Sequence, residues 1–232
     1  MDTQAAVAES PLVLVVDDDE DVRNSLQELM ESVGLDVACF PSPRELLSVG
    51  LPNRPGCLVL DVRMPGASGL DLQHQLSTRG VTKPIVFLTG YGDIPMTVQA
   101  MKAGAVDFLT KPVRDQTLLD AVIAGIQRDV EQRAQAENIH QHSIRFATLT
   151  PRERQVLGEV ARGRLNKQIA FELGISEITV KLHRSNVMRK MHTISVGELI
   201  RAWDRCRPAC ARSLRPDLRR CCHSPETQIH SS

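Results

Sequence analysis

The first half of the chain alternates short apolar runs with longer segments in which apolar residues recur at helical spacing. The apolar runs lie at residues 12–16, 37–40, 57–60, 84–88 and 105–109. None of them alternates cleanly between apolar and polar side chains, which is typical of strands buried on both faces of a parallel sheet. Helical spacing follows each run, at residues 20–33, 43–49, 69–78, 94–103 and 115–129. Five strand–helix units in this order predict an α/β fold with one doubly wound parallel sheet.

The second half of the chain predicts helices only. Residues 148–203 contain four helical segments and no strand-like run. Thr150 can cap the first segment, and Glu153 three residues later completes a capping box. The second segment, residues 166–173, runs into Gly174, and a basic third segment follows that ends near residue 190. Two short helices, a glycine-containing turn and a basic second helix are typical of a helix-turn-helix.

These patterns divide the chain into four parts. Residues 10–127 form the α/β domain, with a flavodoxin-like five-stranded sheet, and residues 148–205 form an all-α domain of four helices. Residues 128–147 are polar and rich in Gln, Glu, Arg and His, so we expect a linker that could extend the preceding helix. Residues 206–232 show neither periodicity nor a core, which predicts a disordered tail.

The formal net charge of zero hides two modules of opposite charge. Residues 1–128 hold 10 Lys and Arg against 17 Asp and Glu, whereas residues 147–205 hold 11 against 6. This asymmetry favours binding of a polyanion by the basic module. No apolar stretch is long enough to cross a membrane and no signal-peptide pattern begins the chain, so we expect a cytoplasmic protein without a membrane partner.

The six cysteines do not form the pattern of a secreted disulfide framework. Cys39 and Cys57 lie in apolar strand runs, where we expect buried, reduced thiols. The spacing of the other four fits no zinc template, and the prolines among them favour disorder. The tail residues that could suggest zinc are Cys206, Cys210, Cys221, Cys222 and His223.

Polar side chains follow the points where the predicted strands end. Asp17 and Asp18 follow the first strand, Asp61 follows the third, and Thr89 and Lys111 follow the last two. Ligands of doubly wound sheets bind outside the carboxyl ends of the strands, so this topology would bring the five side chains into one cleft. Clustered carboxylates repel one another unless a cation lies among them, and oxygen ligands suit Mg²⁺. The sequence therefore predicts a site where Mg²⁺, a carboxylate and a phosphoryl group meet.

This first domain resembles the receiver domain of two-component response regulators over almost all of residues 12–127. The resemblance rests on five stretches that occur in the family's order and at the expected strand ends, and together they are specific. They are Val-Val-Asp-Asp-Asp-Glu (15–20), Leu-Asp-Val-Arg-Met-Pro-Gly (60–66), Leu-Thr-Gly-Tyr-Gly-Asp (88–93), Met-Lys-Ala-Gly-Ala (101–105) and Phe-Leu-Thr-Lys-Pro (108–112).

The resemblance implies that Asp61 accepts a phosphoryl group from a sensor histidine kinase. It also implies a Mg²⁺ ion held by Asp18, Asp61 and the backbone carbonyl of Arg63, with Asp17 acting directly or through water. A cation and hydrogen-bond donors are needed because negative charge develops on the phosphoryl oxygens during transfer.

Thr89 would donate its hydroxyl to a phosphoryl oxygen. Lys111 would place its ammonium against the phosphoryl group and hold the Asp61 carboxylate beforehand. Phe108 stands where the family has its switch residue, although it could equally be an ordinary core residue. The resemblance implies that phosphorylation draws Thr89 inward, that Phe108 then turns in, and that the reshaped surface forms a homodimer. It also implies a cis peptide at Lys111-Pro112.

The second domain resembles the LuxR-type helix-turn-helix over residues 148–203. A receiver joined to such a domain is the architecture of FixJ/NarL-type response regulators, and this chain is most similar to the FixJ-like branch. The matching stretches are Leu-Thr-Pro-Arg-Glu-Arg-Gln-Val-Leu (149–157), Asn-Lys-Gln-Ile-Ala (166–170) and Thr-Val-Lys-Leu-His-Arg-Ser-Asn-Val-Met-Arg-Lys-Met (179–191).

Helical spacing divides the third helix of this domain into two sides. Val180, Val187 and Met191 should pack on Ile169 and Leu173. Contacts to phosphate position such a helix, and contacts to base edges carry sequence information. The residues that we expect to meet DNA are Asn166 and Lys167 on the preceding helix and Lys181, Leu182, Arg184, Ser185 and Arg189 on the third helix, whereas His183 could equally be structural.

Together these features predict a phosphorylation-activated transcription regulator that binds a double-stranded DNA operator and is not an enzyme. One alternative is an aspartyl-phosphate hydrolase, since that chemistry also uses Asp and Mg²⁺ beside a parallel sheet. Such enzymes place a second Asp two residues beyond the nucleophile, where this chain has Arg63. A second alternative is a regulator whose DNA binding ignores phosphorylation, which the intact acidic cleft disfavours.

Overall fold

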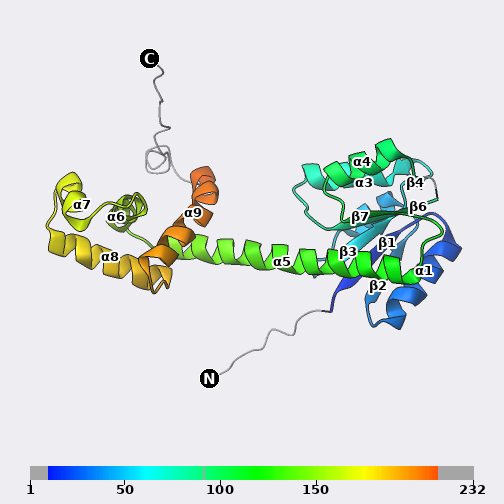
Figure 1. The fold of residues 1–232 in the computed structure, drawn as a ribbon, viewed down its shortest axis with the longest axis horizontal. Coiled ribbons are helices and arrows are strands. Elements are labelled where there is room, and N and C mark those ends of the chain that lie inside the picture. The colour runs from blue at the N-terminus through cyan, green and yellow to red at the C-terminus, as the bar shows by residue number, and fades with distance from the viewer. Residues whose placement is uncertain (1–9, 91, 214–232) are drawn as a thin grey trace, which may run out of the picture. The chain divides into compact units, whose positions relative to one another are not determined.

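The computed structural model describes residues 10–90 and 92–213, which form two compact units divided after Ala134. The first unit is built around a parallel sheet of order β2-β1-β3-β6-β7 (Figure 1). This order is the doubly wound, flavodoxin-like topology that the sequence predicts. The five strands are β1 (Leu12–Val16), β2 (Asp36–Phe40), β3 (Gly56–Leu60), β6 (Ile85–Thr89) and β7 (Asp107–Thr110).

Helices cover both faces of this sheet, which explains why its inner strands β1, β3 and β6 are almost entirely apolar. On one face Leu58 and Phe87 pack against α2, α3 and α4, and on the other Val59 and Val86 pack against α1 and the first part of α5. The helices are α1 (Glu20–Ser32), α2 (Pro43–Val49), α3 (Gly69–Thr78), α4 (Ile94–Lys102) and α5 (Asp115–Ala147).

A small hairpin that the sequence did not predict follows Asp61. Its two strands, β4 (Arg63–Met64) and β5 (Ala67–Ser68), pair antiparallel. Strands of two residues are too short to show a period, so no sequence pattern could reveal them. Ser68 then caps α3 in a capping box with Asp71, which fixes where that helix begins.

Helix α5 takes the place of a separate linker at residues 128–147. The helix is continuous from Asp115 to Ala147, so the polar segment extends the preceding helix, which is one of the two forms expected. Phe146, close to its end, is buried in the core of the second unit. Its ring centroid lies 5.3 Å from that of Trp203.

The second unit contains the four helices that the sequence predicts for its C-terminal domain. Val180, Val187 and Met191 are buried against Ile169, and Leu173 packs beside them, so the predicted core side of the third helix is confirmed. These helices are α6 (Pro151–Ala161), α7 (Asn166–Leu173), α8 (Glu177–Met191) and α9 (Val196–Ser213).

Helix α9 corrects the predicted limit of ordered structure. It continues through residue 213, whereas the sequence placed the start of a disordered tail at residue 206. A helix nucleated by packed residues such as Leu199 and Trp203 extends at little cost per residue, and sequence periodicity does not reveal this. The side chains of the four tail cysteines and of His223 lie outside the described part of the chain.

The two cysteines of the sheet differ in environment. Cys57 on β3 is fully buried, and burial raises the pKa of its thiol to about 12. Cys39 on β2 is only half-buried, so the prediction of a buried thiol is right for Cys57 alone. No helix within the described ranges is both long and apolar enough to cross a membrane.

Candidate functional site

Three carboxylates meet at the carboxyl ends of β1 and β3, which are neighbours in the sheet. Asp17, Asp18 and Asp61 each place one oxygen within 4.8 Å of the oxygens of the other two. Asp17 is buried, Asp61 is half-buried and Asp18 is exposed, so the cluster opens to solvent. The sheet topology thus brings these three predicted residues together.

The donor set of this cluster fits Mg²⁺. The ion prefers carboxylate oxygens and keeps several of its waters, which needs a site that is open on one side. The exposed Asp18 provides that opening, while the buried Asp17 gains most from a cation because its charge is poorly solvated.

Lys111, after β7, supplies the positive charge beside the carboxylates. Its Nζ lies 2.5 Å from Asp17 Oδ2 and 3.4 Å from Asp61 Oδ2. The contact with Asp61 that the resemblance implied is present, and the lysine lies still closer to Asp17. The Lys111-Pro112 peptide is cis, as expected.

Burial shifts the pKa values of the two partners of this ion pair in opposite directions. It raises the pKa of the Asp17 carboxyl, whose side chain is only 3% exposed, and the hydrogen bond from Lys111 offsets this only in part. Burial lowers the pKa of Lys111, which is 23% exposed, but the hydrogen bonds and charges of Asp17 and Asp61 together outweigh it. The pKa of Lys111 is therefore raised overall, and its side chain stays protonated.

The backbone around Asp61 fixes the position of its carboxylate. Its N–H donates to the Val16 carbonyl at 2.9 Å, and its Oδ1 accepts from the Arg63 N–H at 3.2 Å. Gly69 begins α3 so close by that a Cβ there would stand 2.2 Å from the Asp61 carbonyl oxygen. Only glycine permits this approach, so the start of α3 helps to hold Asp61 in place.

Thr89 and Phe108 lie on neighbouring strands beside this cluster. Thr89 ends β6 and is buried, and its carbonyl accepts from the Lys111 N–H at 2.8 Å. Phe108 on β7 is half-buried, with its ring centroid 5.9 Å from that of Phe87. A Cβ on Gly92 would lie 2.8 Å from the Phe108 ring, so the segment after β6 packs directly on this aromatic side chain.

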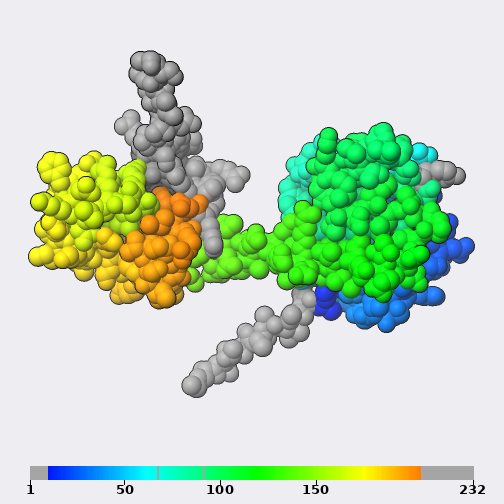
Figure 2. Space-filling model, viewed as in Figure 1, coloured from blue at the N-terminus to red at the C-terminus, as the bar shows by residue number. Residues whose placement is uncertain are grey.

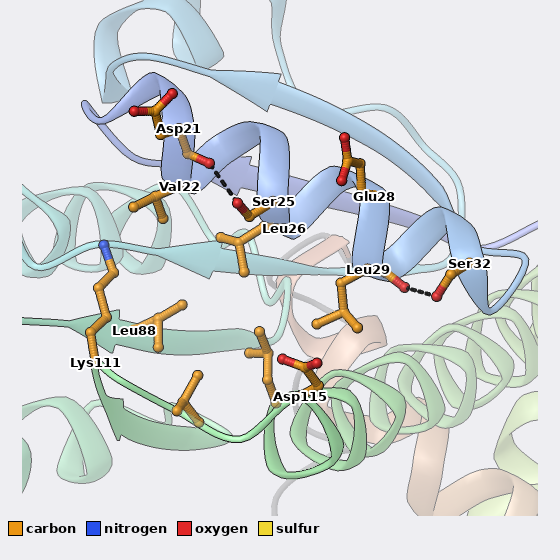
Figure 3. A pocket seen from close by; sticks show the side chains of 12 residues that line it. Asp21, Val22, Ser25, Leu26, Glu28, Leu29, Ser32, Leu88, Lys111 and Asp115 are labelled. Carbon is orange, nitrogen blue, oxygen red and sulfur yellow. Dashed lines mark hydrogen bonds between the residues drawn. The ribbon is translucent and has the colours of Figure 1, made fainter.

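A groove of about 660 Å³ runs beside Lys111, between α1 and the beginning of α5 (Figure 3). Its apolar lining comes from the sheet and both helices, and carboxylates from α1 and α5 add negative charge. The apolar lining residues are Val22, Leu26, Leu29, Leu88, Val113 and Leu118, and the acidic ones are Asp21, Glu28 and Asp115.

A second candidate site is the outward side of α8. Five exposed side chains at three- and four-residue spacing form one line along this helix, which we call the α8 stripe. Space-filling atoms of α7 and α8 form the yellow surface of the C-terminal unit in Figure 2. The sequence analysis did not include Ile178 among the residues expected to meet DNA, although it lies four residues before Leu182 and therefore on the same side of the helix. The stripe consists of Ile178, Lys181, Leu182, Ser185 and Arg189.

Two other residues expected to meet DNA are hydrogen-bonded to each other. Arg184 donates from its guanidinium to Asn166 Oδ1 at 2.6 Å, which joins α8 to the start of α7. Both side chains are half-buried, as is His183, whereas Lys167 beside Asn166 is exposed. Arg184 therefore has a structural partner, and the α8 stripe and Lys167 remain as the accessible surface.

Comparisons with known proteins agree with this architecture. The chain matches the response regulator receiver domain over residues 13–123 and the luxR family of bacterial regulatory proteins over residues 147–203. It is 53% identical over 190 residues to nodulation protein W of Bradyrhizobium diazoefficiens, covering 82% of this chain and 84% of that protein. It is 47% identical over 193 residues to the transcriptional regulatory protein FixJ of Azorhizobium caulinodans, covering 83% and 92%.

Solved structures point the same way. The response regulator StyR superposes with a TM-score of 0.74 at 49% identity, over 84% of this chain and 98% of that one. Full-length FixJ from B. japonicum superposes with a TM-score of 0.52 at 39% identity, over 84% and 97%. Such regulators act on transcription and are not enzymes in the usual sense. This chain therefore belongs to the two-component response regulators, with a receiver domain followed by a LuxR-type DNA-binding domain.

Proposed function

We propose that Asp61 accepts the phosphoryl group from a phosphohistidine of a sensor kinase. A carboxylate oxygen of Asp61 attacks phosphorus, the phosphorus–nitrogen bond breaks, and the imidazole leaves with the electron pair and takes up a proton. The observation that carries this proposal is the placement of Asp61. Its carboxylate is half-buried, accepts a hydrogen bond from the Arg63 N–H and lies 3.4 Å from Lys111 Nζ.

Mg²⁺ would be held by Asp17, Asp18, Asp61 and the backbone carbonyl of Arg63. When bound, the ion would neutralise charge on the phosphoryl oxygens. The ammonium of Lys111 lies between two of these carboxylates and would donate to a phosphoryl oxygen, as would the Thr89 hydroxyl.

The groove between α1 and α5 is where we expect the kinase to dock. It begins at Lys111, so a partner seated in it would bring its phosphohistidine close to Asp61. An apolar lining with acidic residues suits an amphipathic helix that carries basic side chains.

Phosphorylation would act on a homodimer surface through Thr89 and Phe108. If Thr89 moves towards the phosphoryl group, the half-buried Phe108 can follow into the space beside Phe87. Three apolar side chains on neighbouring α4 are exposed at four- and three-residue spacing, a surface suited to a second copy of this chain. They are Ile94, Val98 and Met101.

Beryllofluoride with Mg²⁺, which mimics the phosphoryl group, should convert the protein into a dimer and tighten operator binding at least about tenfold, because two linked DNA-binding domains bind as one. The operator would first be selected from random duplex DNA. Sedimentation and mobility shift at one salt concentration measure the two effects. Val98→Asp should block both while leaving beryllofluoride binding intact. Equal affinity with and without the mimic would support DNA binding that ignores phosphorylation.

Lys181→Ala should weaken operator binding about 5- to 100-fold, the usual effect of removing one base contact. Lys181 lies on the α8 stripe and is exposed, so the variant should fold normally. Fluorescence anisotropy with labelled operator measures the loss. Arg44→Ala removes an exposed charge from α2 and serves as control. Unchanged affinity of Lys181→Ala would contradict the choice of α8 as the DNA-binding surface.

We place this activity in the cytoplasm because the operator DNA is there. An aspartyl-phosphate hydrolase would need a second Asp two residues beyond Asp61, and this chain has Arg63 there. Turnover of a small phosphate ester by the purified protein would revive that alternative.

A further inference from the structure

We propose that Ile178 and Leu182, exposed one turn apart on α8, read thymine methyl groups in the major groove. The operator half-site would then carry A·T pairs at the two positions that face these side chains. This inference rests on the proposed DNA binding by α8 and adds which bases that helix selects.

The first observation is the exposure of two aliphatic side chains where the core does not need them. Ile178 is 79% exposed and Leu182 is 60% exposed. The opposite side of the same helix is fully buried through Val180 and Val187, which already close the core of this unit. Ile178 and Leu182 therefore contribute little to folding.

The second observation is their place on the helix. Ile178 and Leu182 belong to the α8 stripe and lie in the N-terminal half of α8, which begins at Glu177. In a helix-turn-helix, the N-terminal residues of the second helix contact base edges. The aliphatic pair thus stands where base readout occurs, while Arg189, also on the stripe, lies towards the other end of the helix.

The chemistry of the groove then selects the partner. Donors and acceptors cover most of the base edges in the major groove, and the largest apolar group presented there is the 5-methyl of thymine. An aliphatic side chain pressed against the polar edge of a G·C pair would remove water from that edge without replacing its hydrogen bonds. Contact with a methyl group carries no such penalty and buries apolar surface on both sides.

The neighbouring polar residues leave this apolar readout in place. Arg184 is engaged by Asn166 at 2.6 Å. Lys181 flanks the pair on the stripe, and Ser185 follows Leu182 by three residues. A lysine can reach a guanine or a phosphate without displacing either aliphatic side chain from the bases.

Replacing thymine by uracil tests the proposal, because uracil pairs identically and lacks only the methyl group. The full-length protein with beryllofluoride would first select an operator from random duplex DNA. Each thymine of that operator is then replaced by deoxyuridine in turn. Uracil should weaken wild-type binding about fourfold at each of two positions, the value of one buried methylene-sized group. Ile178→Ala and Leu182→Ala should each lose the response at one of these positions.

Ile194→Ala is the matched control, because Ile194 is an exposed aliphatic residue of the same unit that lies outside α8. This variant should keep the response at both positions. Tight operator binding that is indifferent to uracil everywhere, or that stays sensitive in both α8 variants, would overturn the methyl readout and leave the proposed function standing. If no DNA sequence is enriched, the proposed function fails and this inference fails with it.

Discussion

Asp61→Asn should reduce phosphorylation by acetyl phosphate and Mg²⁺ at least about 100-fold, as expected when an enzyme-like site loses its nucleophile. Asparagine keeps the shape of the side chain, but its amide is a poor nucleophile towards phosphorus. It also removes one charge from the cluster formed with Asp17 and Asp18. Because like charges repel, the variant should be at least as resistant to unfolding as the wild type.

Phosphate-affinity electrophoresis and hydroxylamine sensitivity would measure this loss. Asp19→Asn is the matched control, since Asp19 caps α1 by accepting from the N–H groups of Asp21 and Val22. Asparagine caps a helix equally well, so this variant should be phosphorylated at the wild-type rate. Phosphorylation of Asp61→Asn at that rate would show that another residue is the acceptor.

Asp129→Ala should destabilise the receiver domain by about 3–5 kcal/mol, the usual result of breaking a buried ion pair. Asp129 on α5 is 6% exposed, and its Oδ2 accepts from Lys83 Nζ at 2.9 Å, where Lys83 is 5% exposed. The same oxygen accepts from the Gly56 N–H at 2.9 Å and from Arg133 Nε at 3.0 Å. Burial already lowers the pKa of Lys83, and without Asp129 its ammonium would be buried without a counter-charge.

Urea unfolding followed by circular dichroism would measure this effect. The single tryptophan, Trp203, lies in the second unit, so its fluorescence should report a transition that Asp129→Ala leaves in place. Asp120→Ala makes the same change on an exposed part of α5, where the partner is Gln116, and should cost less than about 1 kcal/mol.

A second substitution separates the lost ion pair from lost packing. Lys83→Met in the Asp129→Ala background removes the unpaired ammonium while keeping an apolar stem of similar length. If the buried charge causes the loss, the double variant should recover more than half of the stability. An equal loss in the single and double variants would assign the effect to the Gly56 N–H and Arg133 contacts instead.

The positions of the acidic residues could be predicted because parallel strands end at one edge of a sheet. Asp17 and Asp61 each follow an uninterrupted apolar run, and the doubly wound order places those runs side by side. The core side of α8 was predictable for a similar reason, since helical spacing separates Val180 and Val187 from the exposed residues.

Partners distant in the sequence could not be predicted in this way. Lys111 contacts Asp61 as expected, but its closer contact, with Asp17, was not predicted. Arg184 was predicted only as a DNA contact, and its hydrogen bond to Asn166 was not foreseen. A long side chain such as that of Lys111 or Arg184 can reach more than one acceptor. The packing of helices and loops decides which acceptor it contacts.

The sequence by itself therefore determined the order of elements, the buried faces and the edge of the sheet where the acids gather, because these follow from local periodicity and chain topology. Only the tertiary structure decided which charges pair, which aliphatic side chains stay exposed on α8, and that Asp129 joins Gly56, Lys83 and Arg133. Such contacts depend on distances across the fold of a few ångströms, and no pattern along the chain records those distances.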